Sequence, residues 1–408
     1  MRNALNCVDA RLMDHGKRVA YLMYKVLKPQ NMFDDRQLRD ICILAMLHDV
    51  GAYKTEEIDK LLVFETRDVW EHSIYGYLFL KYFSPLKDLS PAVLFHHTNC
   101  NEINNLDNET HRTLAQLLSM SDRADIFALN KGNNSGFQDY IKKNRNIKYR
   151  DDITDMYLSS RVTIDGIFDN VNSDDDFNNF FYNTPLSNEK ASGYIEMIIY
   201  SIDFRSSQTV IHTVAAACTA AMLASLLGVN NNDIKKIKTG AMLHDIGKIG
   251  IPVSILESTS KLNDMDMGIM RRHVEITEKI LEGNVDDEIM NIAVRHHEKL
   301  DGSGYHKKLG AGDITFFDRI VMIADIFSAL YGARSYKESF SKERVVGILS
   351  DLSGKNLIDP KITSTAIENY EVIIEAIDAE SAPVIQAYNL MNEEYHKIRG
   401  DINSWVHA

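Results

Sequence analysis

Apolar residues along this chain recur mainly at spacings of three and four positions, the pattern of a helix that buries one face. In the stretch 319–330, Ile320, Ile323, Ala324 and Phe327 share one such face. The alternating pattern of a half-buried strand is scarce, and only seven prolines interrupt the chain. The sequence therefore predicts an all-α protein.

Two series of histidines and aspartates repeat in the same order roughly 200 residues apart, which indicates an internal duplication. The first series is His15, His48, Asp49, His72, His96, His97 and Asp122. The second series is His212, His244, Asp245, His273, His296, His297 and Asp325. The neighbouring sequence recurs as well, as AMLHDVGAYK in the first half and AMLHDIGKIG in the second. This repetition predicts two related helical domains in tandem.

Composition indicates where these domains end. Residues 131–186 are rich in asparagine and aspartate and predict a linker or a poorly packed insertion, although 153–171 can form a short helix. We therefore expect one domain at 1–130 and another at 187–375. The last segment, 376–408, mixes apolar and charged positions and predicts a helical tail that serves packing or oligomerisation.

Charge and composition exclude several classes of partner. The formal net charge of the 408-residue chain is −13, so nonspecific binding to nucleic acid is not expected. The apolar runs are too short or too interrupted to cross a bilayer, and the N-terminus lacks the apolar core of a secretory signal. The four cysteines, Cys7, Cys42, Cys100 and Cys218, form no CxxC pair, which is typical of reduced thiols. These features predict a cytoplasmic protein without membrane or bulk nucleic-acid partners.

The residue types of the two series suit metal ions. Imidazole and carboxylate ligands together favour Fe, Mn and similar transition metals over Mg²⁺ and Ca²⁺, which prefer oxygen ligands. Adjacent helical residues point about 100° apart, so the aspartate of a His-Asp pair can be shared between two ions. The second series offers enough ligands for two divalent ions and leaves a position for water. Such a pair activates water and stabilises an in-line displacement at phosphorus.

Two further features of the second half suit a phosphate substrate. Lys248 follows Asp245 by three residues, so its charge lies near the metal ligands, where it can hold a phosphate oxygen. The segment 296–307, HHEKLDGSGYHK, passes from a histidine pair into a glycine-rich turn, in which Gly302 permits close backbone approach. The phenol of Tyr305 can then reach a phosphate or a base.

These motifs resemble the HD superfamily of metal phosphohydrolases, and the second half resembles its HD-GYP branch. Members of that branch are bacterial phosphodiesterases for cyclic di-GMP and related 3′,3′-linked cyclic dinucleotides. The matching segments are LHDIGKIGIP, MRRHVEITEKIL, HHEKLDGSGYH, IVMIADIFSALYGARSYK and SGKNLIDP, within roughly residues 195–365. The resemblance implies two HD-type helical bundles in tandem and hydrolysis of a cyclic dinucleotide to a linear one.

The resemblance also implies roles for individual residues. The second series supplies the ligands of two Fe, Mn or similar ions, and Asp245 and Lys248 are expected to be catalytic. Lys248, Tyr305, Arg334 and Lys337 are expected to face the phosphates of the substrate, with Gly302 in the substrate-binding turn. Because Arg334 and Lys337 are three residues apart, they can form a local positive spot in an acidic protein.

Three positions of the second half depart from the family pattern. His306 stands where the proline of Gly-Tyr-Pro would stiffen the turn. Gln208 stands where some members have a glutamate for a third metal, so two metals are expected. Ser328 replaces an aspartate that commonly follows the last metal ligand by three residues, which leaves the base preference open.

The first half resembles a divergent HD domain. Its series, from His15 to Asp122, offers a second set of metal ligands. However, Ala52 stands where the second half has Lys248, and HHTNCNEIN replaces HHEKLDGSGYH. Three roles stay open for this half: metal binding without matching catalysis, another phosphohydrolase activity, or a structural role.

The expected substrate is cyclic di-GMP or cyclic GMP-AMP, and two alternatives stay open. One is an HD hydrolase of another nucleotide, such as a deoxynucleoside triphosphate or a guanosine polyphosphate. The other is a non-catalytic sensor or scaffold that binds a cyclic dinucleotide. A homodimer or a regulatory protein partner is a further option that the sequence does not decide.

Overall fold

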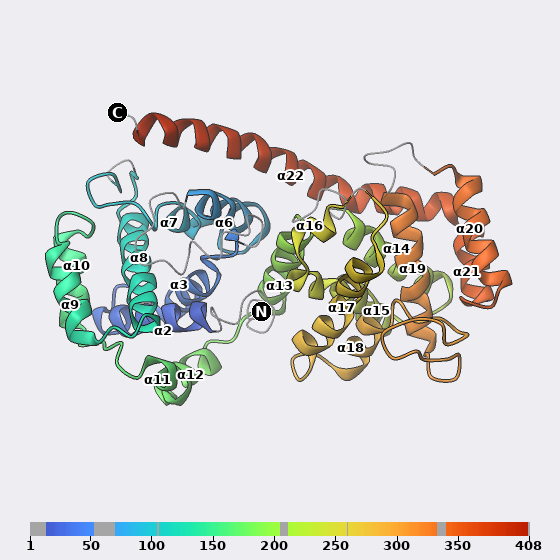
Figure 1. Cartoon of the computed structure of the whole chain (residues 1–408), viewed down its shortest axis with the longest axis horizontal. Helices are drawn as coiled ribbons and strands as arrows, with labels where there is room; N and C mark the ends of the chain where they lie inside the picture. Colours follow the sequence, from blue (N-terminus) through green and yellow to red (C-terminus); the bar gives the residue numbers. More distant parts are fainter. Residues whose placement is uncertain are drawn as a thin grey trace. The chain divides into compact units, whose positions relative to one another are not determined.

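The computed structural model describes residues 14–52, 70–103, 106–204, 211–258, 260–332 and 340–406, and Figure 1 labels most of their helices. Within these ranges the regular elements are helices, with isolated bridge pairs but no β-strand. The predicted all-α fold is therefore confirmed. No helix in the described ranges has the length and apolar character needed to cross a membrane.

Backbone contacts divide the chain into two compact units. One unit extends from Asp9 to Ser201 and includes Glu393–Ala408, and the other is Ile202–Asn392. The first unit begins with α2 (His15–Leu27), α3 (Asp35–Leu47), α6 (Trp70–Phe83), α7 (Pro91–Leu94) and α8 (Glu109–Leu129), with short 3₁₀ helices at Lys28–Gln30 and Lys87–Leu89. α2 packs against α3 and α8. These helices form a bundle whose interior holds the first histidine series.

The segment 131–186 is more ordered than its composition predicts. It forms α9 (Asn134–Lys143), α10 (Asp151–Ser159), α11 (Ile167–Ser173) and α12 (Asp175–Asn183). Phe137 and Ile141 of α9, and Ile153 and Tyr157 of α10, are fully buried. Apolar residues four positions apart therefore give these short helices a packed face.

The division between the units lies closer to residue 202 than to the expected 187. Helix α13 (Asn188–Asp203) belongs almost entirely to the first unit, where the ring of Tyr200 packs 5.2 Å from that of Phe83. Gly193 of the same helix lies against Pro85, whose Cγ would be 3.1 Å from an added Cβ. These contacts explain why residues 188–201 join the first unit.

The second unit is a helical bundle built around α14. Its elements are α14 (His212–Leu226), α15 (Asn231–Leu243), a 3₁₀ helix (Ile246–Gly250), α16 (Val253–Leu256), α17 (Asp264–Leu281), α18 (Asp287–Val294), α19 (Phe316–Gly332), α20 (Lys342–Gly354) and α21 (Pro360–Glu368). α14 packs against both α15 and α19, which lie beside it in Figure 1. Its contact face carries Ala217, Ala220 and Ala224, which are almost fully buried. Small side chains let the helix axes approach closely.

The predicted tail lies within a single helix, α22 (Tyr370–Val406). Tyr370, Ile373 and Ile377 belong to the core of the second unit. In the first unit, the Glu394 carboxylate accepts hydrogen bonds from the hydroxyl of Tyr77 at 2.8 Å and from that of Tyr82 at 2.7 Å. The first part of α22 therefore belongs to the second unit, and its last part belongs to the first unit.

Candidate active site and metal centres

The second histidine series converges inside the second unit from five helices or their ends. His212 begins α14, His244 and Asp245 follow α15, and His273 lies in α17. His296 and His297 follow α18, and Asp325 lies in α19. Ligand atoms of His212, His244 and Asp245 lie within 4.8 Å of one another, as do those of His273, His296 and His297. All seven predicted ligands are therefore brought together, and six of them are buried.

Hydrogen bonds fix which ring nitrogen each histidine offers. In His244, His273 and His296, Nδ1 lies 2.6–2.7 Å from the carbonyl oxygen three residues earlier. A carbonyl only accepts, so Nδ1 must carry the proton and Nε2 must keep its lone pair when the ring is neutral. This arrangement is typical of metal-ligating histidines.

The free Nε2 atoms face one another in pairs. They are 3.2 Å apart between His212 and His244 and 3.3 Å apart between His273 and His296. The Nδ1 of His212 meets the hydroxyl of Ser328 at 3.1 Å, and that hydroxyl donates to the carbonyl of Asp325. Nδ1 of His212 must therefore donate as well. Two lone pairs this close require a proton or a metal ion between them, so the residues present fit a metal.

Asp245 presents one carboxylate oxygen to each histidine group. Its Oδ2 lies 3.5 Å from Nε2 of His212 and 3.1 Å from Nε2 of His244, whereas its Oδ1 lies 3.5 Å from Nε2 of His273. Oδ1 is buried and has no hydrogen-bond partner among the described residues. Asp325 adds an oxygen 3.2 Å from Nε2 of His212. This geometry suits a carboxylate shared by two cations.

The shifted pKa values of the second series also indicate that positive charge stabilises its buried carboxylates. Burial lowers the pKa of His212, but hydrogen bonds to Asp245 and Asp325 outweigh it and raise this pKa to about 9. Burial lowers the pKa of His297 to about 4. Burial opposes ionisation of Asp245, yet the neighbouring His244 and Lys248 hold its pKa well below the ordinary range. Both carboxylates thus favour a cation beside them.

A glycine after each His-Asp pair allows this convergence. A Cβ on Gly247 would lie 1.9 Å from the carbonyl oxygen of His273. In the first unit, a Cβ on Gly51 would lie 2.0 Å from the carbonyl oxygen of His72. Only glycine permits this approach, which holds the His-Asp segment against the helix that carries the next ligand.

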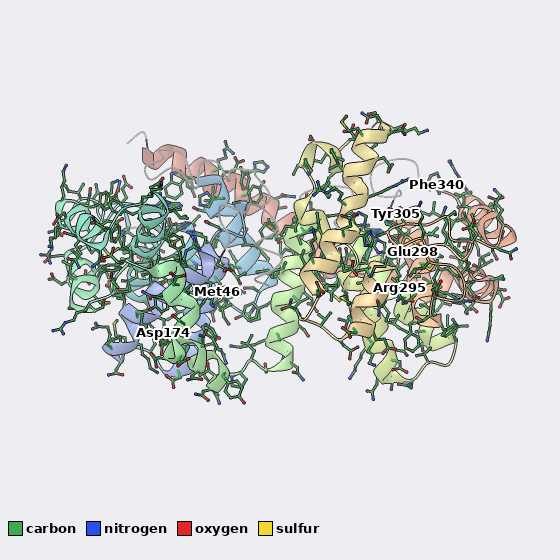
Figure 2. The ribbon with its side chains drawn as sticks, turned by 60° about the horizontal axis from the view of Figure 1, so that its bottom comes forward. Met46, Asp174, Arg295, Glu298, Tyr305 and Phe340 are labelled. Carbon is green, nitrogen blue, oxygen red and sulfur yellow. The ribbon has the colours of Figure 1, made fainter. Side chains whose placement is uncertain are left out.

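Only some of the residues predicted to contact the phosphates belong to the part of the chain that the structure describes. Nζ of Lys248 lies 2.5 Å from Oδ2 of Asp245. The ring of Tyr305 packs 4.7 Å from that of His297, and Gly302 has a φ of 77°, which favours glycine. Figure 2 labels Tyr305 with Glu298 and Arg295 of the preceding segment. Arg334, Lys337 and Gln208 lie outside the described residues.

Two residues near the centre were missed by the sequence analysis. Arg271, two residues before His273, holds its guanidinium 5.1 Å from the centre of the Tyr305 ring. Asp203 is buried, and burial together with the charge of Asp245 raises its pKa to about 7. The MRRH motif contains Arg271 and could have drawn attention to it, whereas nothing in the local sequence marks Asp203.

The first histidine series converges in the first unit in the same way. Ligand atoms of His15, His48 and Asp49 form one group within 4.8 Å, and those of His72, His96 and His97 form another. Nε2 of His72 lies 3.1 Å from Nε2 of His97, and Nε2 of His15 lies 3.4 Å from Oδ1 of Asp122. Within the described residues, Nε2 of His48 and Oδ1 of Asp49 are buried without a hydrogen-bond partner. These residues also fit a metal.

Two arginines distinguish the first centre. Arg123 contacts Oδ2 of Asp122 at 2.6 Å through one guanidinium nitrogen and at 3.0 Å through another. Arg18 contacts both oxygens of Asp125, whose Oδ2 also lies 2.7 Å from Nδ1 of His15. All of these side chains are buried. The first centre therefore contains its own compensating cations.

Comparison with known proteins identifies the second half. Residues 196–362 match the HD domain family. This segment is an HD domain. The resemblance predicted from the motifs is thereby confirmed for the segment that carries the second histidine series.

Relatives with known activities extend the comparison. The chain is 25% identical over 404 residues to 3′3′-cGAMP-specific phosphodiesterase 1 of Vibrio cholerae, covering 93% of this chain and 92% of the relative. The chain is also 35% identical over 176 residues to the cyclic di-GMP phosphodiesterase response regulator RpfG of Xanthomonas campestris, covering 42% of this chain and 46% of that relative. The chain thus corresponds to nearly all of the first relative and under half of the second.

The fold also has a counterpart among solved structures. A crystal structure of a cyclic GMP-AMP-specific phosphodiesterase from V. cholerae superposes with a TM-score of 0.52 and 16% identity, covering 97% of each chain. The HD domain and its relative therefore share the helical architecture, and the likeness extends over both halves of the chain.

Proposed function

We propose that this chain is a metal-dependent phosphodiesterase that hydrolyses 3′,3′-cyclic dinucleotides, either cyclic GMP-AMP or cyclic di-GMP. The relatives that carry these activities support the substrate class. The observation that carries the proposal is the carboxylate of Asp245, which presents one oxygen to each of two buried histidine groups. A pair of cations would account for this geometry.

The residues of the second series hold two divalent transition-metal ions, such as Fe or Mn, in this proposal. Such ions supply Lewis acidity toward a phosphoryl oxygen and activate water for attack on phosphorus. In the net reaction one water is consumed and one phosphorus–oxygen bond to ribose breaks. The product is a linear dinucleotide with one phosphate monoester and one free hydroxyl.

The chain's own residues position the substrate. Burial lowers the pKa of Lys248, but the charge and hydrogen bond of Asp245 outweigh it and keep the ammonium protonated, so Lys248 supplies a cation for a non-bridging phosphate oxygen. Tyr305 lies beside His297 and can contact the phosphate or the base. We expect Arg334 and Lys337 to contribute further phosphate contacts.

For the first unit we propose metal binding without cyclic-dinucleotide hydrolysis. Its ligand groups match those of the second unit, but Ala52 replaces Lys248 and no Gly-Tyr turn follows His97. Another phosphohydrolase activity and a structural role are the alternatives. We also propose that the two units are separate HD-type domains, that the protein acts in the cytoplasm, and that any homodimer or regulatory partner is secondary to the hydrolysis.

Incubation with defined substrates tests the proposed function. Mn- or Fe-loaded protein is incubated with cyclic GMP-AMP, cyclic di-GMP and cyclic di-AMP, and with a deoxynucleoside triphosphate and a guanosine polyphosphate, and products are separated by chromatography. We expect linear dinucleotides from at least one 3′,3′-linked substrate and none after chelation of the metal. Cleavage of only the last two compounds would indicate a different HD hydrolase. Binding of a cyclic dinucleotide without turnover would indicate a sensor.

A further inference from the structure

The turn that carries Tyr305 is fastened to its own segment through the buried side chain of Glu298. The two carboxylate oxygens of Glu298 accept hydrogen bonds from the backbone N–H of Lys307 at 2.7 Å and of Leu309 at 3.0 Å. The backbone N–H of Tyr305 donates to the carbonyl of His297 at 3.1 Å. A Cβ on Gly304 would lie 2.4 Å from Cα of Glu298, so the turn and this segment are in direct backbone contact.

A second set of contacts joins the turn to helix α17. Nε2 of His306 lies 3.2 Å from Oε2 of Glu278, and Nζ of Lys307 lies 2.5 Å from Oε1 of the same carboxylate. Nδ1 of His306 lies 3.6 Å from Oε1 of Glu275. Burial alone would raise the pKa of Glu278, but Lys307 and His306 hold it below the ordinary value. Glu278 is therefore a charged acceptor for both side chains.

The same helix carries parts of the candidate active site. His273 lies in α17, and Arg271, two residues earlier, stands over the ring of Tyr305. Tyr305 is thus held between the histidine pair that precedes the turn and the helix that faces it. Any shift of the turn relative to α17 changes the position of the phenol relative to His297 and His273.

We propose that His306 and Glu278 form a clasp that positions Tyr305 for the cyclic dinucleotide. His306 is a positioning residue that replaces the rigidity of a proline. Proline restricts the turn through its ring, whereas His306 restricts it through a charge-assisted contact with a neighbouring helix. The inference rests on the proposed phosphodiesterase function, because it concerns how the same site holds its substrate.

The clasp affects positioning and leaves the metal ligands in place. We expect His306→Ala to lower kcat/KM for the cyclic dinucleotide roughly tenfold, mainly through KM, since small displacements of binding groups have effects of this order or larger. Glu278→Gln is expected to act in the same direction. Bound metal is expected to stay at the wild-type level. Hydrolysis of bis(4-nitrophenyl) phosphate, which has no nucleobase for Tyr305 to contact, is expected to fall less than hydrolysis of the cyclic dinucleotide.

Rescue by proline distinguishes positioning from a general structural role. His306→Pro is expected to restore kcat/KM to within about twofold of the wild type, because the ring fixes φ without the contact to Glu278. The matched control is Glu282→Gln, which removes an exposed carboxylate immediately after the last residue of α17 and is expected to change nothing. Circular dichroism checks folding, and His306→Gln serves as a second variant if His306→Ala is unfolded.

Several outcomes would overturn the clasp. Wild-type KM in folded His306→Ala and Glu278→Gln would exclude it, as would equal losses for the cyclic dinucleotide and bis(4-nitrophenyl) phosphate. Failure of His306→Pro to restore activity would assign His306 a different role. If the wild type cleaves none of the cyclic dinucleotides, the proposed function fails instead. The clasp is then judged from calorimetric affinity for a hydrolysis-resistant phosphorothioate cyclic dinucleotide, where unchanged affinity in His306→Ala would reject it.

Discussion

The two histidine-aspartate centres of this chain use corresponding positions as ligands. They differ in which cationic side chains balance the charge of their carboxylates. In the first centre, Arg123 contacts Asp122, and Arg18 contacts Asp125. In the second centre, the position after Asp325 is Ile326, and Ser328 stands where the first centre has Asp125. The charged side chain nearest the shared carboxylate there is Lys248, which the first centre replaces with Ala52.

This difference concerns where positive charge is placed around similar ligands. In the first centre the arginines pair with the carboxylates in fixed geometry, which stabilises those carboxylates with or without a ligand. In the second centre the cation stands beside the carboxylate that faces both histidine groups, on a flexible side chain that can turn to a phosphate. We infer that the first arrangement favours a stable metal site and the second favours turnover of a phosphate ester.

The largest expected effect comes from removing the His-Asp pair of the second centre, and the same change in the first centre is the comparison. We expect His244→Ala with Asp245→Ala to eliminate cyclic-dinucleotide hydrolysis and to lower the metal content, because the shared carboxylate and one imidazole are lost. We expect His48→Ala with Asp49→Ala to leave turnover within about an order of magnitude of the wild type. Turnover and metal content are measured in both variants after circular dichroism confirms that they are folded. An inactive first-half variant beside an active second-half variant would reverse the assignment.

The next largest effect is expected from replacing Arg18, one of the two buried arginines of the first centre. Arg18→Met removes the guanidinium that contacts both oxygens of the buried Asp125 carboxylate, so we expect the metal-free protein to lose about 3–5 kcal/mol of unfolding free energy. Trp70 begins α6 in the first unit, so urea unfolding followed by its fluorescence reports on that unit. Lys28→Met, which removes an exposed ion pair with Asp35, is the control and should cost under about 1 kcal/mol.

The loss of stability in Arg18→Met is also expected to depend on pH. Burial alone would raise the pKa of Asp125, but hydrogen bonds from His15 and Arg18 hold it below the ordinary value. A lowered folded-state pKa contributes stability above the unfolded-state pKa, near 3.9, and this contribution is lost as pH falls through the folded-state value. We therefore expect the stability difference between wild type and Arg18→Met to narrow below about pH 4. A difference that stays constant down to pH 2 would mean that Asp125 is not the group affected.

The contrast between the centres also shows what sequence can and cannot predict. The helical class follows from the three-and-four spacing of apolar residues, and the convergence of each series follows from its repetition. The contacts of Arg18, Arg123 and Ser328 could not be predicted, because each depends on which side chains of different helices become neighbours. A lysine three residues from a ligand is visible in sequence, whereas an arginine paired across a bundle is not.

The order of residues 131–186 was underestimated for a local reason. The asparagine and aspartate content of this segment predicts a linker, yet several of these residues stand at the N-termini of helices. The side chain of Asn133 accepts from the backbone N–H of Gly136, and that of Asp174 accepts from Phe177. These residue types are preferred at helix N-termini, so a segment with several short helices is enriched in them. The buried aromatic residues spaced along the same segment were the signal that could have corrected the interpretation.

A smaller effect is expected from replacing Lys248 of the second centre with the alanine found at the corresponding position of the first centre. Lys248→Ala introduces the residue found at position 52, and we expect kcat to fall on the order of a hundredfold while metal content is unchanged. The loss arises because the site then lacks a fixed cation for a phosphate oxygen. Lys238→Ala, which removes an exposed ion pair with Glu380, is the control. Loss of metal together with activity would show that Lys248 supports the ligands rather than the substrate.

The smallest expected effect concerns the residue that orients His212. Ser328→Ala removes the acceptor for Nδ1 of His212, so we expect metal affinity to fall about 10–100-fold, measured by competition with a chromophoric chelator. Ser328→Asp introduces the residue of the first centre and restores an acceptor, so its affinity should exceed that of Ser328→Ala. The added carboxylate is buried, however, and Ala215 stands where the first centre has Arg18. Ser328→Asp should therefore bind metal well yet unfold at lower urea than the wild type, because its new charge has no arginine partner. Wild-type metal affinity in Ser328→Ala would show that His212 is held by its helix alone, and that the difference between Ser328 and Asp125 has no bearing on the metal.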